Sequence, residues 1–126
     1  MAQAIQNEIQ DSNHAIHQAA WGDLAGLTIE TLTGAGWIEL TLCISVATPS
    51  AYQAPTYFCF SIDGVSLDLY RAVCSPVANG PQSVTFSRLF KPGAGQHIFK
   101  VRDVCTPYAT TVEERSALFH LKEFGF

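Results

Sequence analysis

The amino-acid sequence predicts an all-β protein: an antiparallel jelly-roll sandwich of about eight strands with a short N-terminal arm. Three observations favour this fold class. Short segments alternate between apolar and polar residues, clusters of Gly, Pro, Asn and Asp separate these segments, and no convincing helical period lies between them. Strands of this kind, joined by turns, are typical of antiparallel sandwiches.

The clearest strand is predicted over residues 37–46, WIELTLCISV. Its apolar residues alternate strictly with the others, as expected for a half-buried strand. Residues 57–63, YFCFSID, repeat the pattern with Phe58, Phe60 and Ile62 inward. The pair Asp63-Gly64 follows, which is a strong hairpin signal. The predicted inward residues of the first segment are Ile38, Leu40, Leu42, Ile44 and Val46.

Further strands are predicted on both sides of these two segments. Their sequences are LTIETL (27–32), VSLDLYRAV (65–73), SVTFSRLF (83–90), HIFKVRDV (97–104) and SALFHLKEF (116–124). The turn KPGAGQ (91–96) has a strand on each side, whereas a phosphate-binding loop needs a helix after its glycines. We therefore interpret Pro92 and the two glycines as a corner between strands.

Length and composition indicate one ordered domain without general affinity for nucleic acid or membranes. The chain has 126 residues and a net charge of −4, a size that suits a single core and a charge that does not attract nucleic acid or anionic lipid. No apolar run approaches the roughly 20 residues of a membrane span, and the N-terminus lacks the pattern of a signal peptide. We expect a soluble protein made in a cytoplasm.

The charges are distributed unevenly along the chain. All seven basic residues lie from Arg71 onward, whereas the first 70 residues contain seven acids and no base. This asymmetry suggests that the acidic half meets a basic surface, on the same fold, a neighbouring copy or another partner. The alternative interpretation is chance combined with a solvated face.

Residues 1–20 are predicted to form an N-terminal arm ahead of a domain at residues 21–126. The arm is rich in Gln, Asn and Ala, with Ile5, Ile9 and Ile16 as isolated apolar anchors. Ile5 and Ile9 are one helical turn apart, so a short helix is one option. Three aliphatic residues cannot stabilise a lone helix in water, so the arm would be ordered only against something else. The alternative is a frayed terminus.

One sequence of features carries a resemblance to a known family. FSIDG (60–64), Arg71, SVTFSRLF, AGQHIFKVR (94–102) and the closing SALFHLKEF occur in this order. The order resembles small jelly rolls of the tumour-necrosis-factor-like type found in bacteriophage structural proteins, from about Trp21 to the C-terminus. The resemblance implies a homotrimer that acts as a capsid decoration (cement) protein or as the tip of a tail fibre. The four cysteines and the Gln-rich arm lie outside this pattern.

Motifs for catalysis or metal binding are not found in the sequence. A G-x-S-x-G elbow and a Ser-x-x-Lys pair are both absent. His14 and His17, with Glu8 nearby, could share a helix face, but we favour a polar arm over a metal site. His97 and His120 each stand alone, and a lone strand histidine is more often a satisfied surface residue than a ligand. We expect no catalytic residue, no metal and no cofactor.

The four cysteines show no C-x-x-C spacing, so a zinc or redox motif is not indicated. Cys43 and Cys59 lie at the positions that alternate with the apolar, inward-facing residues of their strands. They could become neighbours if those strands pair. Without a secretory signal we favour reduced thiols that fill small interior or interface spaces. Disulfides are the alternative, and four cysteines, the other two being Cys74 and Cys105, allow three pairings.

Bulky side chains on the faces of strands that point away from the predicted core suggest self-association. A sandwich of this size has one core, so such side chains need a second surface. The alternative is a twisted sheet whose edges and loops cover them. The predicted trimer-interface residues are Trp37, Tyr57, Cys59, Phe119 and Phe124.

The functional expectation is therefore a virion structural protein without enzymatic activity. It would be a homotrimer on the capsid surface that stabilises the shell of major capsid protein, with Ile5, Ile9 and Ile16 of the arm binding the capsid. Neither nucleic acid nor a membrane is expected as a partner. The alternative is a receptor-binding tip of a tail fibre or baseplate, in which Tyr52 stacks on a sugar.

Overall fold

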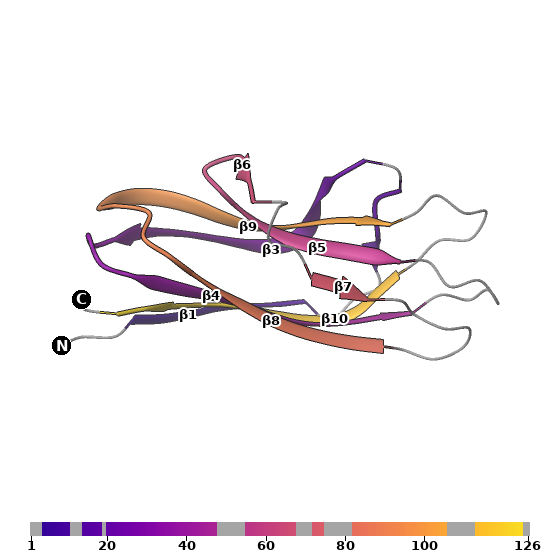
Figure 1. Cartoon of the computed structure of the whole chain (residues 1–126). Helices are drawn as coiled ribbons and strands as arrows, with labels where there is room; N and C mark the ends of the chain where they lie inside the picture. Colours follow the sequence, from indigo (N-terminus) through magenta and orange to yellow (C-terminus); the bar gives the residue numbers. More distant parts are fainter. Residues whose placement is uncertain are drawn as a thin grey trace.

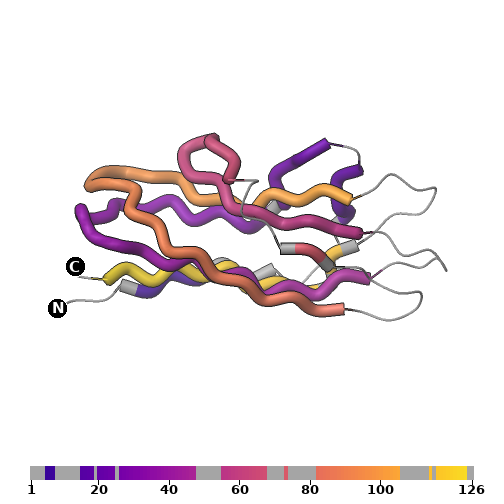
Figure 2. Tube along the Cα trace, in the orientation of Figure 1, coloured from indigo at the N-terminus to yellow at the C-terminus, as the bar shows by residue number. Residues whose placement is uncertain are grey.

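The protein is a two-layered all-β sandwich, seen in a computed structural model that describes residues 4–10, 14–18, 20–47, 55–67, 72–74, 82–105 and 113–124. Figures 1 and 2 show the two sheets stacked with their long strands running along the molecule. All strand pairs within the sheets are antiparallel. The predicted fold class, an antiparallel jelly-roll sandwich, is confirmed.

Each sheet contains five strands in the described part of the chain. Sheet A has the order β1 (Ala4–Gln10), β10 (Glu113–Glu123), β4 (Ile38–Ala47) and β8 (Gln82–Phe90), and β2 (His14–Ala15) also pairs with β10. Sheet B has the order β3 (Gly22–Thr33), β9 (Gly95–Cys105), β5 (Thr56–Ile62) and β6 (Val65–Ser66), and β7 (Ala72–Cys74) also pairs with β5. The long strands alternate between the sheets along the chain, which brings distant segments side by side.

The core lies between the two sheets and is built from their inward-facing residues. On β4 the predicted inward set is buried, from Ile38 to Val46. Phe60 of sheet B joins the two layers, because its ring stacks on Phe86 at 4.6 Å and on Phe119 at 5.7 Å between centroids. Phe90 meets the same ring edge-on at 6.4 Å. Aromatic contacts of this kind add to the burial of apolar area across the sandwich.

Two strand predictions need correction. The predicted strand over residues 65–73 is divided into the short strands β6 and β7. On β5, Cys59 and Ser61 lie on the outward phase as expected, opposite Arg102 and Lys100, but they are buried, at 0% and 2% exposed. The chain at 63–67 folds back over this face, since the Leu67 amide donates to the Phe60 carbonyl at 2.9 Å and the Cys59 Sγ lies 3.4 Å from the Ser66 Oγ. Local alternation cannot foresee a neighbouring segment that covers the second face.

The described N-terminal residues form sheet structure, where the sequence indicated an arm ordered only against something else, with a short helix as one option. Strand β1 pairs with β10 from Ala4↔Glu123 to Gln10↔Ala117, and β2 continues along the same partner. Ile16 is 2% exposed and belongs to the core. The spacing of Ile5 and Ile9 suits a helical turn, but residues four apart also share one face of a strand. The open edge of β10 selects the extended form.

The two predicted turns are confirmed. Asp63 and Gly64 both have positive φ, 52° and 83°, as the tight turn between β5 and β6 requires. Gly93 and Gly95 also have positive φ in the corner between β8 and β9. This corner leads from one sheet to the other and brings the start of β9 beside the Asp63 turn (Figure 1).

Candidate functional site

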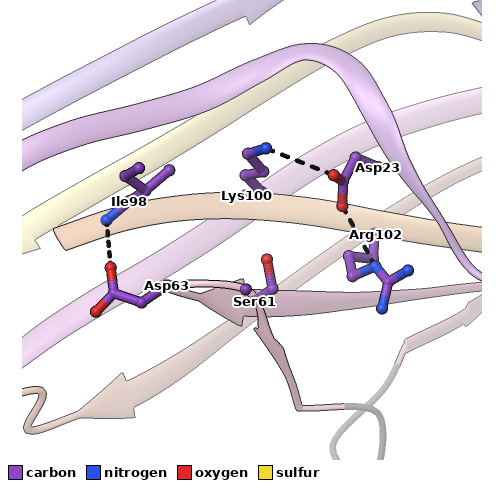
Figure 3. Close-up of a pocket in the computed structure, with 7 residues that line it drawn as sticks. Asp23, Ser61, Asp63, Ile98, Lys100 and Arg102 are labelled. Atoms are coloured by element: carbon purple, nitrogen blue, oxygen red, sulfur yellow. Dashed lines mark hydrogen bonds and ion pairs between the residues drawn. The ribbon is translucent and has the colours of Figure 1, made fainter.

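A polar cleft of about 380 Å³ lies on the outer face of sheet B. Figure 3 shows its lining side chains converging from β3, β5, β9 and the turn after β5. These strands are neighbours in the sheet, so their outward positions in matching register face one space: Ser61 lies opposite Lys100, and Asp23 opposite Arg102. The lining residues are Asp23, Ser61, Asp63, Gly64, Ile98, Lys100 and Arg102.

Asp23 bridges the two cations of the cleft. Its Oδ2 lies 3.5 Å from the Lys100 Nζ, and its Oδ1 lies 3.3 Å from the Arg102 Nε. The second contact is an ion pair whose alignment does not make a hydrogen bond, and the buried Arg102 Nε has no hydrogen-bond partner. Arg102 is fixed instead by its Nη2, which donates to the Trp21 carbonyl at 3.1 Å. Lys100 is the more exposed cation, at 37%.

Asp63 and His97 form a second pair at one end of the cleft. The Asp63 Oδ2 lies 2.6 Å from the His97 Nδ1, and the Asp63 Oδ1 accepts from the Ile98 amide at 2.8 Å. The His97 Nε2 in turn donates to the Gly93 carbonyl at 2.9 Å. The His97 hydrogen bond, aided by the Ile98 amide, lowers the pKa of Asp63. The Asp63 carboxylate, aided by the Gly93 carbonyl, raises the pKa of His97.

A third polar pair fixes the chain just before β3. The carboxylate of Asp103, fully buried, accepts from the His17 amide at 3.1 Å and binds the His17 Nδ1 at 2.8 Å. Burial raises the pKa of Asp103, and the His17 contacts offset part of this rise. The Gly22 backbone leaves room for the His17 ring, because a side chain at that position would collide with it. This pair holds the N-terminal segment to β9.

The outer face of sheet A carries a patch that combines exposed apolar side chains with two lysines. We call it the sheet A patch. Register brings its members together: Ile5, Lys122, Glu39 and Leu89 lie in one row across four strands. Beside this row the Phe124 amide donates to the Trp37 carbonyl at 3.0 Å. The patch comprises Ile5, Trp37, Glu39, Leu89, Lys91, Lys122 and Phe124.

Three apolar side chains of the sheet A patch are exposed to solvent. Ile5 is 56% exposed, Leu89 55% and Trp37 38%. The two lysines lie over aromatic rings, with the Lys91 Nζ 5.9 Å from the centre of Trp37 and the Lys122 Nζ 5.2 Å from that of Phe124. Cations above aromatic faces are favourable, so this end of sheet A presents one surface suited to another protein.

The predicted interface residues are divided among three environments. Trp37 and Phe124 meet on the sheet A patch, together with Ile5 from the predicted arm. Tyr57 is half-buried on sheet B. Cys59 and Phe119 are each 0% exposed within the sandwich, and Ile16 is 2% exposed. Ile16 and Phe119 therefore belong to the core of the single chain, whereas Cys59 lies under the segment 63–67 on the outer face of sheet B.

Two predicted site residues are described incompletely or not at all. For Ile9 the structure gives the backbone pairing with Leu118. Tyr52, the expected sugar-stacking residue, lies outside the described residues. The lone histidines have local partners: His97 binds Asp63, and His120 contacts the side-chain oxygen of Asn7. Sequence reasoning missed the sheet B cleft, since its residues are far apart in the chain.

The uneven charge distribution is resolved in part within the fold. Acids of the first half meet bases of the second half, as in the pairs of Asp23 with Lys100 and Arg102. Glu39 lies beside Lys122 in the register of β4 and β10. The interleaved strand order explains this pairing, because strands from the two halves of the chain lie side by side in each sheet.

The thiols and the remaining polar groups do not form a metal centre in the described part of the chain. Cys43 and Cys59 lie in different sheets, so the strands that carry them do not pair, and neither they nor Cys105 form a disulfide. No group of three or more His, Cys, Asp or Glu side chains among the described residues could hold a metal ion. The same residues include no helix able to cross a membrane.

Comparison with solved structures supports the sandwich architecture. The chain is similar to one from the infectious bursal disease virus Gx strain, with a TM-score of 0.66 and 7% identity, over 98% of this chain and 32% of that one. It is also similar to a chain of the VP2 subviral particle of infectious bursal disease virus, with a TM-score of 0.58, 6% identity and coverage of 96% and 37%. A third similar chain is dimeric latent PorU from Porphyromonas gingivalis, with a TM-score of 0.59, 9% identity and coverage of 96% and 13%.

These comparisons define a fold class. The chain spans about a third of the first virus chain, and the identities are low, so the likeness is one of fold. The class is a jelly-roll sandwich that also occurs in a virus particle. No protein-family model matches the chain, and no curated protein matches it.

Proposed function

We propose that this chain is a virion structural protein without enzymatic activity: a homotrimeric decoration, or cement, protein of the bacteriophage type. It is made in the host cytoplasm and binds the shell of major capsid protein at the capsid surface, which it stabilises. Its work requires no cofactor, nucleic acid or membrane. The observation that carries the proposal is the sheet A patch, and the fold shared with virus chains supports it.

The patch favours a protein partner for energetic reasons. Ile5 lies on β1, Leu89 on β8 and Trp37 just before β4, but all three lie at one end of one face. Each Å² of apolar surface removed from water contributes roughly 25 cal/mol, so covering such a cluster stabilises an assembly. The flanking Lys91 and Lys122 favour a partner with acidic groups around an apolar centre. A neighbouring copy and the capsid shell both offer extended protein surfaces of this kind.

The structure changes the expected way in which the N-terminus takes part. Ile5 acts from the surface of β1, a strand held in the sheet, and Ile16 contributes to folding instead of docking. A rigid strand loses less conformational entropy on binding than a free arm. Three copies of the same surface in one trimer then engage the shell together, with an avidity far above that of one contact.

The first experiment measures the oligomeric state of the purified protein and its dependence on the patch. Native mass spectrometry of the wild type is expected to give a trimer, and Trp37→Asp is expected to shift it to monomers because a charge replaces an interface aromatic. Leu32→Asp is the matched control, since Leu32 is 69% exposed on sheet B. A monomeric wild type, or equal effects of the two variants, would contradict the proposed role of the patch.

The second experiment tests the virion assignment directly. Quantitative mass spectrometry of purified virus particles would give the copy number relative to the major capsid protein. Peptides must come from a non-tryptic digest or from the basic half, because no Lys or Arg precedes Arg71. Hundreds of copies in simple ratio to the capsid protein are expected for a cement protein. A few copies would favour a receptor-binding tip, and none would refute both assignments.

A further inference from the structure

The sheet B cleft has a hydroxyl group in its lining. Ser61 is 2% exposed, and its side chain lines the cleft between Lys100 and Arg102 (Figure 3). A hydroxyl placed in this way at the floor of a cleft is available to a ligand, to which it can both donate and accept.

The charges of the cleft leave one positive charge in excess. The Asp63 carboxylate is already paired with His97, whose two ring nitrogens both face acceptors, an arrangement that favours the protonated ring. Lys100 and Arg102 share the single carboxylate of Asp23. Two cations against one remaining anion give a net charge of about +1 at the open part of the cleft, which favours a ligand with one anionic group.

The other lining groups suit a hydroxylated ring. Asp23 and Asp63 are 52% and 46% exposed, so each can accept hydrogen bonds from ligand hydroxyls in addition to its present contacts. Ile98 is 37% exposed and offers an aliphatic surface to the C–H face of a ring. The volume of about 380 Å³ falls within the range of small-ligand sites. The sheet B cleft thus combines hydrogen-bond acceptors, a hydroxyl, one net positive charge and an apolar contact.

We propose that this cleft binds an acidic saccharide, a sugar ring that carries one carboxylate. The ligand carboxylate pairs with Lys100 and Arg102, and its hydroxyl groups bind Ser61, Asp23 and Asp63. An inorganic anion would leave the two carboxylate acceptors unused, and a neutral sugar would leave the excess positive charge unused. The cleft lies on the sheet opposite the sheet A patch, so the isolated protein can bind the sugar whether or not it joins a particle.

The test is a titration of the ¹⁵N-labelled full chain, followed by amide chemical shifts. The probes are sodium D-glucuronate and N-acetylneuraminate, with D-glucose as the neutral comparison and sodium acetate as the anion-only comparison. Saturable shifts at Ser61, Ile98 and Lys100 are expected for the acidic sugars. We expect the affinity for glucose and for acetate to be at least about tenfold lower, since each lacks one set of contacts.

Variants separate the proposed site from general charge effects. Lys100→Gln keeps most of the side chain and is expected to weaken binding roughly tenfold, as for loss of a charge-assisted contact. Ser61→Ala is expected to weaken it by about threefold to tenfold. Lys91→Gln on sheet A is the matched control and should leave binding unchanged.

Several outcomes would overturn the proposal. Absence of saturable shifts with both acidic sugars would do so, as would equal affinity for acetate, which would indicate an anion site only. Tighter binding of an acidic peptide such as tetraglutamate would assign the cleft to protein recognition. Equal losses of affinity in Lys100→Gln and Lys91→Gln would show that binding depends on the net charge of the protein and not on this cleft.

Discussion

The carboxylate of Asp63 and the imidazole of His97 lie 2.6 Å apart and join two turns of the sandwich. His97 also donates to the Gly93 carbonyl, which accepts a second hydrogen bond from the Thr33 hydroxyl at 2.9 Å. A carboxylate and a carbonyl are both acceptors, so the histidine must be an imidazolium to satisfy both. The hydrogen bonds that join the two turns at this end of sheet B therefore depend on pH.

We predict that this link makes stability depend on the charge of His97. The raised pKa of His97 means that its contribution is complete below its ordinary value of about 6.5 and is lost as pH rises through the folded value. The lowered pKa of Asp63 means that its contribution is present above about 3.9 and is lost as pH falls further. Stability from this pair is thus greatest between about pH 4 and 6.5.

The measurement is the melting temperature of the wild type and of His97→Gln at pH 5.5 and pH 9. The variant is expected to melt lower by roughly a few degrees at pH 5.5, with a smaller difference at pH 9. His120→Gln is the control, since the hydrogen-bond partner of His120 in the described part of the chain is an uncharged side-chain oxygen, that of Asn7. Equal differences at the two pH values would contradict a charged His97.

A second prediction concerns the contact between Gly22 and His17. In Gly22→Ala the new methyl group would collide with the His17 ring and displace it from Asp103. Asp103 is fully buried, so losing this partner is expected to cost about 1–3 kcal/mol in the free energy of unfolding. Urea denaturation measures this cost. In a His17→Ala background the same change should cost much less, and additive effects would show that the two residues are not coupled.

A third prediction concerns Phe60, the ring that joins the two sheets. Phe60→Ala removes contacts with Phe86, Phe90 and Phe119 and leaves a cavity, so it should lower the free energy of unfolding by about 3–5 kcal/mol. Leu32→Ala, at an exposed position, should change it by less than about 0.5 kcal/mol. A small effect of Phe60→Ala in urea denaturation would mean that the layers are not packed through this residue.

A fourth prediction concerns the thiols. Cys59 and Cys105 are buried, and burial raises the pKa of Cys105 to about 11, with the charge of Asp103 adding to the rise. At pH 8 only about one Cys105 in a thousand would be a thiolate even if reagents could reach it. Iodoacetamide should therefore modify the half-exposed Cys43 before Cys59 and Cys105, as mass spectrometry of peptides would show. Rapid modification of Cys59 or Cys105 in the folded protein would contradict their burial.

The strands themselves could be predicted from local pattern. The period-two alternation from Ile38 to Val46 fixes both the conformation of β4 and its buried face, because only one phase is apolar. The turns at Asp63-Gly64 and Pro92–Gly95 follow from backbone angles that few residues adopt. Where the pattern admitted two solutions, as for Ile5 and Ile9, the sequence could not choose between helix and strand.

What the sequence by itself determined was the all-β class, most strands and the two main turns, since these depend on residues close together in the chain. The tertiary structure alone decided which surfaces are free and which side chains meet. It covered Cys59 and Phe119, incorporated the N-terminal residues into sheet A, and brought Asp63 to His97, 34 residues away. Such contacts depend on strand order and register, which are set by the packing of the whole sandwich and not by any local period.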